Sequence, residues 1–385
     1  MGGRDMDGQD VLLIAGFIVL ALLALIGILA VVVHRLAAAM GAAHAPVDGY
    51  DRRLEIWGEQ VPGNRSESKR ADMNVGRGGN LFLYRLKFFA DLTGERFRDV
   101  ERTMDTFTWL YEIQGGYELP TYEDRPYLVP YLAAGSDRGV IVLPGGGFGY
   151  KSMDGEYGEG RDVARTLQRH GVSAFVLHYR ANPYEYPVPL LDVQRAVRYL
   201  KYHAGALGLD PDKLGLLGFS AGGALVGGHI NLVRGQDLFP EGYAPDEVDR
   251  MDDSVAAPAM IYPGLTFRYT PRALFGLFDA DAVRDPERRA QLVEGTDMVR
   301  YACRSARLPQ FVAWGTRDRI VGVKGPAEYV RSARAAGAEV AEVVARGRGH
   351  AFGQRYYMAD YLAWLDQVLS RAGEKPEQTS VERTR

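Results

Sequence analysis

The chain has 385 residues, with Lys+Arg 46, Asp+Glu 49 and a formal net charge of −3 at pH 7. A hydrophobic share of 46% and a charged share of 25% are ordinary for globular proteins, and exclude a mostly disordered or collagen-like chain. The near balance of charge leaves no basic field that would attract nucleic acid. The single cysteine, Cys303, excludes an intramolecular disulfide framework and any multi-cysteine metal site.

Residues 11–33 form the first predicted element, because they carry no charge, no proline and no strongly polar side chain. As a helix they would extend for roughly 35 Å, which is enough to cross a hydrocarbon core of about 30 Å. We therefore predict a short tail, residues 1–10, followed by a transmembrane helix that makes the chain a single-pass membrane protein. The alternative is a cleaved signal peptide, and Ala43-His44-Ala45 resembles a cleavage site, but the apolar run is long and its start is not basic. The flanking charges favour a cytoplasmic body only weakly and leave the side of the membrane open.

Residues 34–126 are predicted to form a juxtamembrane and helical extension. Glycine and proline mark residues 61–80 as a loop, and two apolar helical patterns follow it, Leu81 to Leu92 and Phe97 to Tyr111. The second pattern could be a dimer seam, although packing on the main domain is the simpler interpretation. The oligomeric state is left open.

From Tyr127 onward, short β-rich runs alternate with helical patterns, which indicates a largely parallel sheet with helices on both faces. The predicted strands are 127–132, 139–143, 173–179, 214–219, 257–262, 310–314 and 339–345. The predicted helices are 158–170, 188–206, 222–233, 326–336 and 358–371. This domain should span residues 127–372 and be followed by a polar tail, residues 373–385.

An insertion at about 264–302 interrupts the alternation of strands and helices. It carries four aromatic residues, Phe267, Tyr269, Phe275 and Phe278. The insertion could cap a functional site, or pack these side chains as core.

The most informative motif is Gly218-Phe219-Ser220-Ala221-Gly222, a G-x-S-x-G between an apolar strand and a helical pattern. In this context the serine sits on a strained turn, and a Cβ on either glycine would collide with the neighbouring strand and helix. The turn exposes the hydroxyl at the carboxyl end of the sheet, where the helix amino terminus favours developing negative charge. We predict that Ser220 is a nucleophile.

A glycine run, Pro144-Gly145-Gly146-Gly147-Phe148, follows the strand that ends at Leu143. Acyl transfer needs two N–H donors aimed at the oxyanion, and glycines let a backbone turn its amides into a cavity. We predict that the donors are the amides of Gly146, Gly147 and Ala221. A phosphate or dinucleotide loop is disfavoured, because the run matches neither phosphate-binding glycine pattern.

A serine hydroxyl needs a base, and of the 7 histidines only His350 lies in a glycine-rich loop, after the last strand. The others lie beside the apolar segment, in helical patterns or at a strand end, where structural histidines are usual. The orienting acid should come between serine and histidine, and Asp318 follows an apolar strand there. Asp297, inside the insertion, is the weaker candidate for that acid.

Residues 127–371 resemble the α/β-hydrolase superfamily, and most of all its carbohydrate-acetylesterase and carboxylesterase branch. The resemblance rests on the glycine run, on Tyr186-Pro-Val-Pro-Leu-Leu-Asp192, on the serine motif and on Gly349-His350-Ala-Phe352. It implies ester hydrolysis by a Ser220–Asp318–His350 triad, with no metal or organic cofactor, on a small-molecule or carbohydrate ester. Because the glycine run begins with Pro144, where the hormone-sensitive-lipase-like esterases carry histidine, we favour short acyl groups such as acetyl.

Three other functions are weighed against this one. A membrane-associated lipase would exploit the anchor. A serine peptidase of the prolyl-oligopeptidase kind would need propeller blades of about 40 to 45 residues each, for which residues 34–126 offer little room. A catalytically silent hydrolase fold could act as a binding scaffold, although none of the three triad residue types is missing.

Overall fold

The computed structural model describes residues 8–43, 48–64, 125–148, 151, 153, 158–181 and 184–372. The helical patterns expected at Leu81 to Leu92 and Phe97 to Tyr111, the tail 373–385, and most of the loop 61–80, the tail 1–10 and the cleavage-like segment lie outside these residues. The chain divides into two units, Met1–Ala45 and Pro46–Arg385.

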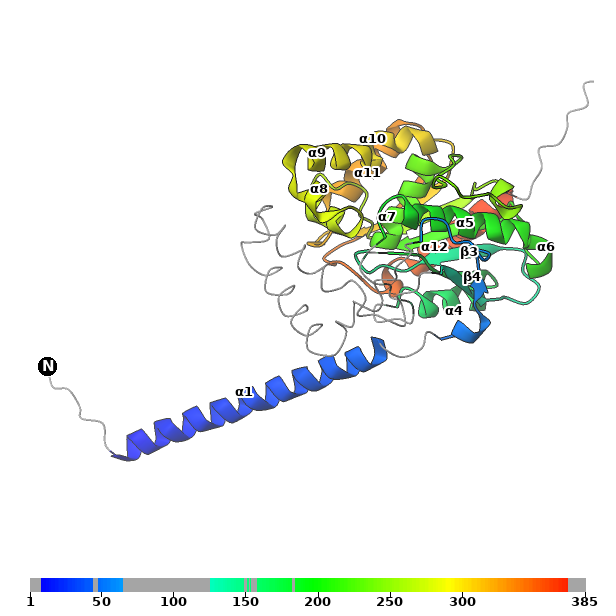
Figure 1. Ribbon diagram of the computed structural model, residues 1–385. Coiled ribbons are helices and arrows are strands. Elements are labelled where there is room, and N and C mark those ends of the chain that lie inside the picture. Colours follow the sequence, from blue (N-terminus) through cyan, green and yellow to red (C-terminus); the bar gives the residue numbers. More distant parts are fainter. Residues whose placement is uncertain are drawn as a thin grey trace, which may run out of the picture. The chain divides into compact units, whose positions relative to one another are not determined.

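The described residues of the first unit form one helix, α1 (Gly8–Ala43) (Figure 1). Within it, Ile14–Val32 is apolar and exposed along its length, and is long enough to cross a membrane. An apolar helix this close to the start of the chain fits a membrane span and a signal sequence equally well.

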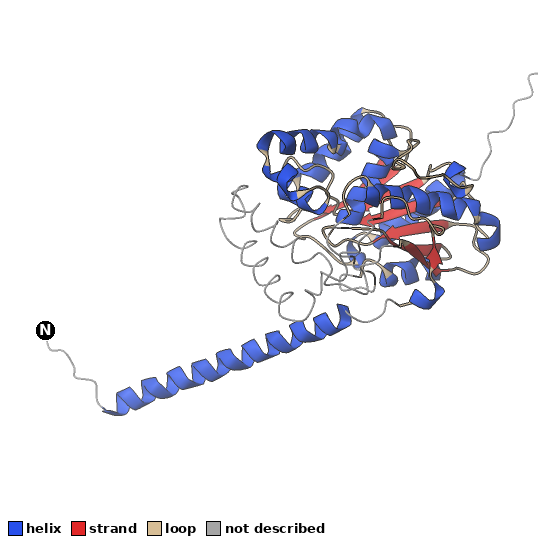
Figure 2. Ribbon diagram, in the orientation of Figure 1, coloured by secondary structure: helices blue, strands red, loops and turns tan. Residues whose placement is uncertain are grey.

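The second unit is built on an eight-stranded sheet with the strand order β1-β2-β4-β3-β5-β6-β7-β8 (Figures 1 and 2). The first two pairs, β1–β2 and β2–β4, are antiparallel and all the others are parallel. The strands are β1 (Leu54–Glu55), β2 (Tyr127–Tyr131), β3 (Gly139–Leu143), β4 (Ser173–His178), β5 (Leu214–Phe219), β6 (Ala257–Ile261), β7 (Gln310–Gly315) and β8 (Val340–Ala345). The predicted largely parallel sheet is therefore confirmed, and the predicted strands agree with β2 to β8 to within one residue at each end.

Helices cover both faces of the sheet, because its buried strands are apolar on both sides. In β3, for example, Ile141 and Leu143 join the core beneath one set of helices, while Val140 and Val142 join the core beneath the other. The first set comprises α5 (Val188–Tyr202), α7 (Ala221–Gly228) and α11 (Lys324–Ala335), and the second α4 (Arg161–Arg169) and α12 (Met358–Ala372).

Two predicted helices are subdivided in the structure. The helix expected at 188–206 ends at Tyr202 and is followed by the short α6 (Ala204–Leu207). The helix expected at 222–233 changes from α7 to a π-helical turn, η4 (His229–Val233). The remaining short helical segments are η1 (Tyr50–Arg52), η5 (Val248–Arg250), η6 (Pro271–Gly276), α8 (Ala280–Arg284), α9 (Pro286–Gly295), α10 (Met298–Tyr301), η7 (Ala302–Ser305) and η8 (Gln354–Tyr356).

Residues 48–64, which the sequence assigned to the extension, pack against this domain and contribute the edge strand β1. Trp57 is buried, and its indole N–H donates to Asp192 Oδ1 at 3.1 Å. The fully buried Arg180 binds Asp192 at 2.6 Å and also donates to the carbonyl of Pro62. These buried charges have partners on both segments, so the segment 48–64 satisfies polar groups that the domain alone would leave unpaired.

Candidate active site

Ser220 lies in the turn between β5 and α7, with φ 51° and ψ −112°. A Cβ on Gly218 would lie 2.2 Å from the carbonyl oxygen of Gly222, and one on Gly222 would lie 2.0 Å from that of Leu143. Neither position tolerates a larger residue without moving backbone, as the sequence motif suggested. The turn therefore holds Ser220 in a strained conformation at the carboxyl edge of the sheet.

Three side chains that the sequence singled out meet at this edge. Nε2 of His350 lies 2.8 Å from Oγ of Ser220, and Nδ1 of His350 lies 2.7 Å from Oδ2 of Asp318. An ionised carboxylate only accepts, so the imidazole proton sits on Nδ1 and leaves Nε2 to accept from the serine hydroxyl. This arrangement can transfer a proton from Ser220 to His350 while Asp318 fixes the ring.

The Asp318 carboxylate is fixed in turn by the backbone. Oδ1 accepts the amides of Ile320 and Val321 at 2.9 and 3.1 Å, and the residue is only 6% exposed. The histidine loop passes close over the end of β7, where a Cβ on Gly315 would lie 2.5 Å from the carbonyl oxygen of Arg348. Glycine at 315 therefore permits the approach of the two loops.

The weaker candidate acid, Asp297, serves another purpose. Its side chain accepts the amide of Val299 at the start of α10 and pairs with Arg268 Nε at 3.1 Å. The carboxylate that the structure places on His350 is that of Asp318.

The glycine run follows β3 directly and touches the serine turn. Gly146 and Gly147 have φ values of 142° and 62°, which favour glycine. A Cβ on Gly145 would lie 3.0 Å from Cβ of Ser220, so the run closes tightly over the nucleophile position. Ala221, the third expected oxyanion donor, is the first residue of α7.

Sequence reasoning missed two buried residues beside this run, Glu159 and Tyr262. Glu159 accepts the amide of Gly145 at 2.7 Å and the hydroxyl of Tyr262 at 2.8 Å. Burial, followed by the charge of Glu159, raises the pKa of Tyr262 well above its usual range, so its hydroxyl stays protonated. No sequence motif marks either residue, because Glu159 and Tyr262 are 103 positions apart in the chain and meet only in the folded structure.

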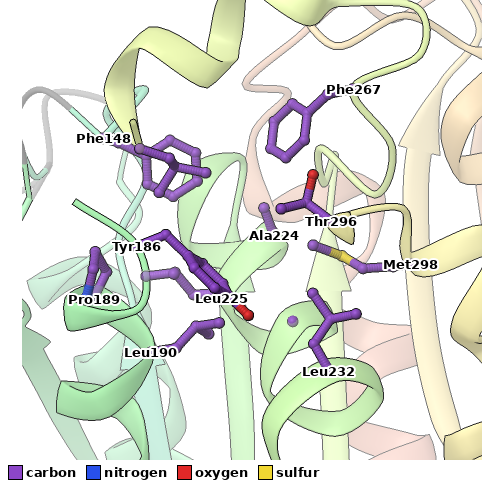
Figure 3. Close-up of a pocket in the computed structure, with 12 residues that line it drawn as sticks. Phe148, Tyr186, Pro189, Leu190, Ala224, Leu225, Leu232, Phe267, Thr296 and Met298 are labelled. Carbon is purple, nitrogen blue, oxygen red and sulfur yellow. The ribbon is translucent and has the colours of Figure 1, made fainter. Parts of the chain in front are cut away.

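A small apolar cavity of about 20 Å³ adjoins the site (Figure 3). Its wall includes Phe148, which follows the glycine run, and Ala224, whose amide donates to the carbonyl of Ser220 one turn earlier in the chain. The remaining lining residues are Tyr186, Pro189, Leu190, Leu225, Gly228, Leu232, Phe267, Leu277, Thr296 and Met298. The cavity therefore lies next to both the glycine run and the serine helix.

The insertion 264–302 supplies part of this wall, but not all of its aromatic residues lie at the cavity. Phe267 lines the cavity, and Phe278 packs against the lining residue Tyr186 with ring centroids 5.7 Å apart. Tyr269 is partly exposed and donates to Glu328 at 2.6 Å instead. The side chain of Phe275 lies outside the described part of the structure.

Other histidines have structural partners. His229 is fully buried, binds the carbonyl of Asp253 at 2.9 Å, and has a pKa that burial lowers. His170 binds Asp366 at 2.9 Å, and His178 stacks on Tyr127. Within the described residues, no group of three histidine, cysteine or acidic side chains could hold a metal ion.

Comparison with known proteins agrees with this architecture. Residues 128–237 match the BD-FAE family model, and residues 188–372 match that of the prolyl oligopeptidase family. A crystal structure of an acetyl ester-xyloside bifunctional hydrolase from Caldicellulosiruptor lactoaceticus is similar with a TM-score of 0.53 and 26% identity, over 65% of this chain and 89% of that one. The chain belongs to the α/β-hydrolase superfamily, and the predicted fold class is confirmed.

Two curated relatives are esterases. An acetylxylan esterase from Xylanibacter ruminicola is 33% identical over 90 residues, which are 23% of this chain and 18% of that protein. Esterase LipC from Mycobacterium tuberculosis is 27% identical over 220 residues, which are 55% of this chain and 52% of that protein. The alignments thus span about half or less of each curated relative.

Proposed function

We propose that the chain is a serine hydrolase that cleaves short-chain carboxylic esters, with Ser220 as nucleophile, His350 as base and Asp318 as orienting acid. The observation that carries the proposal is the continuous hydrogen-bonded series Asp318–His350–Ser220 at the carboxyl edge of the sheet. The hydroxyl is unreactive without a base, and the series supplies one at hydrogen-bond distance. The esterase relatives add support from an independent direction.

In the proposed reaction, Ser220 Oγ attacks the ester carbonyl while His350 Nε2 takes the hydroxyl proton. The amides of Gly146, Gly147 and Ala221 stabilise the oxyanion. As the carbon–oxygen bond breaks, His350 returns the proton to the departing alcohol, which leaves an acyl-enzyme. A water molecule, deprotonated by His350, then releases the carboxylic acid and restores Ser220.

The apolar cavity supports a short acyl group. The cavity is apolar and small, about 20 Å³, which suits a short acyl group better than a long alkyl chain. A carbohydrate as the alcohol part of the ester is supported by the names of two similar proteins, an acetylxylan esterase and an acetyl ester-xyloside hydrolase. The membrane anchor proposed for residues 11–33 would tether this activity to a membrane.

The experiment is hydrolysis of p-nitrophenyl acetate, butyrate and laurate, and of acetylated xylan, by the detergent-solubilised full chain. We expect acetate to be the preferred p-nitrophenyl ester, and a fluorophosphonate probe to label Ser220. Ser220→Ala should abolish both hydrolysis and labelling without changing the melting temperature by more than a few degrees. Labelling of a different serine would remove the assignment of the nucleophile.

A peptidase is the second candidate, favoured by the match of residues 188–372 to the prolyl oligopeptidase model. Prolyl p-nitroanilide peptides, assayed beside the esters, separate the two functions. A kcat/KM for the peptides above that for p-nitrophenyl acetate would replace the esterase proposal, and a maximum at laurate would favour the lipase. Release of acetate from acetylated xylan would support the carbohydrate substrate.

A further inference from the structure

Glu159 is a buried carboxylate that the proposed reaction does not use. It lies two residues before the first residue of α4 and is only 3% exposed. A carboxylate taken from water is costly unless hydrogen bonds replace its hydration. Its position must therefore be explained by the groups that it binds.

One carboxylate oxygen of Glu159 holds the start of the glycine run. Oε2 accepts the amide of Gly145 at 2.7 Å, and a Cβ on Gly145 would lie 2.8 Å from this oxygen and 3.0 Å from Cβ of Ser220. Gly145 is thus confined between the carboxylate and the nucleophile. The two residues that follow it, Gly146 and Gly147, are two of the proposed oxyanion donors, so the position of Gly145 determines the position of their amides.

The other carboxylate oxygen holds the wall beside the base. Oε1 accepts the hydroxyl of Tyr262 at 2.8 Å, and the ring of Tyr262 stands against that of His350, with centroids 5.0 Å apart at 61°. The amide of Tyr262 donates to Ala313 on β7, which anchors the tyrosine backbone. The tyrosine thereby limits the tilt of the imidazole.

We propose that Glu159 is a positioning residue that sets the glycine run and the His350 ring at the correct separation around Ser220. This inference rests on the proposed function. A single rigid carboxylate with one oxygen on each group couples two loops that are separated in the chain by more than a hundred residues. Hydrogen bonds to an ionised acceptor are roughly twice as strong as neutral ones, so the carboxylate is suited to the task.

The experiment compares Glu159→Ala, Glu159→Gln and Tyr262→Phe in the detergent-solubilised full chain. In Glu159→Ala both contacts are lost, and we expect kcat for p-nitrophenyl acetate to fall about 100-fold, as when one oxyanion donor is displaced, with KM within about threefold. Glu159→Gln keeps one acceptor oxygen, so we expect about a tenfold loss. Tyr262→Phe removes only the contact on the histidine side and should cost about threefold to tenfold.

A matched control is available in Asp253, another buried carboxylate that is 2% exposed and accepts the amide of Gly235 at 3.0 Å. It precedes β6 and so lies near the amino ends of the parallel strands, whereas Ser220 lies at their carboxyl ends. Asp253→Ala should lower the melting temperature while kcat stays within about twofold. If Glu159 had a purely structural role, Glu159→Ala would likewise lower the melting temperature and leave kcat within about twofold of the wild-type value.

A second measurement separates positioning from loss of stability. A trifluoromethyl ketone forms an oxyanion on Ser220, so its inhibition constant should rise in the same proportion as kcat/KM falls across the three variants. If Glu159→Ala kept the wild-type kcat and inhibition constant, this inference would be overturned while the proposed function would stand. If Glu159→Ala does not fold, wild-type values in both milder variants would have the same consequence. An inactive wild-type chain without fluorophosphonate labelling would overturn the proposed function and this inference with it.

Discussion

Oγ of Ser220 lies 2.8 Å from Nε2 of His350, although the two residues are separated by 130 positions in the chain. The parallel strands β5 and β8 end at the same edge of the sheet, Ser220 directly follows β5, and His350 lies in the loop that follows β8. The proximity is therefore a consequence of strand direction, and it holds the two groups at the distance that proton transfer needs.

Asp318→Asn should reduce kcat by orders of magnitude, because an amide can hold the imidazole in the wrong tautomer. Asp297→Asn is the control, since Asp297 binds Val299 and Arg268 rather than His350. The measurement is steady-state hydrolysis of p-nitrophenyl acetate. If the Asp297 variant were the inactive one, the acid would have to be reassigned.

Met298→Ala should widen the apolar cavity and admit longer acyl groups. Each methylene newly accommodated is worth about 1 to 3 kcal/mol, so the ratio of kcat/KM for octanoate to that for acetate should rise about tenfold. Met358→Ala is the matched control, because Met358 is similarly buried but packs in the core of the other sheet face. An unchanged ratio in Met298→Ala would show that the acyl chain binds elsewhere.

Residues 48–64 should be needed for a stable domain. A chain that begins at residue 125 loses the side chain of Trp57 and the carbonyl that Arg180 binds, and leaves β2 as an exposed edge. We expect a chain beginning at residue 46 to melt cooperatively and the shorter chain to aggregate or melt far lower. The point variant Trp57→Ala should cost about 3 kcal/mol or more in urea denaturation, and a loss below about 1 kcal/mol would contradict this role.

Asp246 should make stability depend on acid pH. Hydrogen bonds from Arg195 lower the pKa of its carboxyl to about 2, from the usual 3.8. Because the pKa in the folded state is depressed, the stabilisation is present above about pH 4 and is lost as the pH falls towards 2.

In urea denaturation, Asp246→Asn should therefore destabilise the protein at pH 7 and match it near pH 2. Nearly half of the side chain is exposed, so we expect a loss of about 1 kcal/mol or less at pH 7. Asp212→Asn, at an exposed position, should show no such difference. If the difference in free energy of unfolding between the wild type and Asp246→Asn grew as the pH fell, the result would contradict the stabilising role of this ion pair.

The sequence by itself determined the alternation of strands and helices, and with it the parallel sheet. Hydrophobic runs such as Leu214–Phe219 are local signals, because a strand buried on both faces must be apolar throughout. The serine motif was equally local, since the strained turn needs its own glycines at 218 and 222. Strand direction then allowed Asp318 and His350 to be named from their positions after strands, and the structure brings them to Ser220; their catalytic roles remain predictions.

Only the tertiary structure decided what surrounds these residues. Glu159 and Tyr262 carry no motif, because each is defined by a partner more than a hundred residues away or on another loop. The strand Leu54–Glu55 is too short to show a periodic pattern, and it exists because β2 offers it an edge to pair with. The apolar cavity likewise depends on packing between the insertion and α7, which residue order does not encode locally.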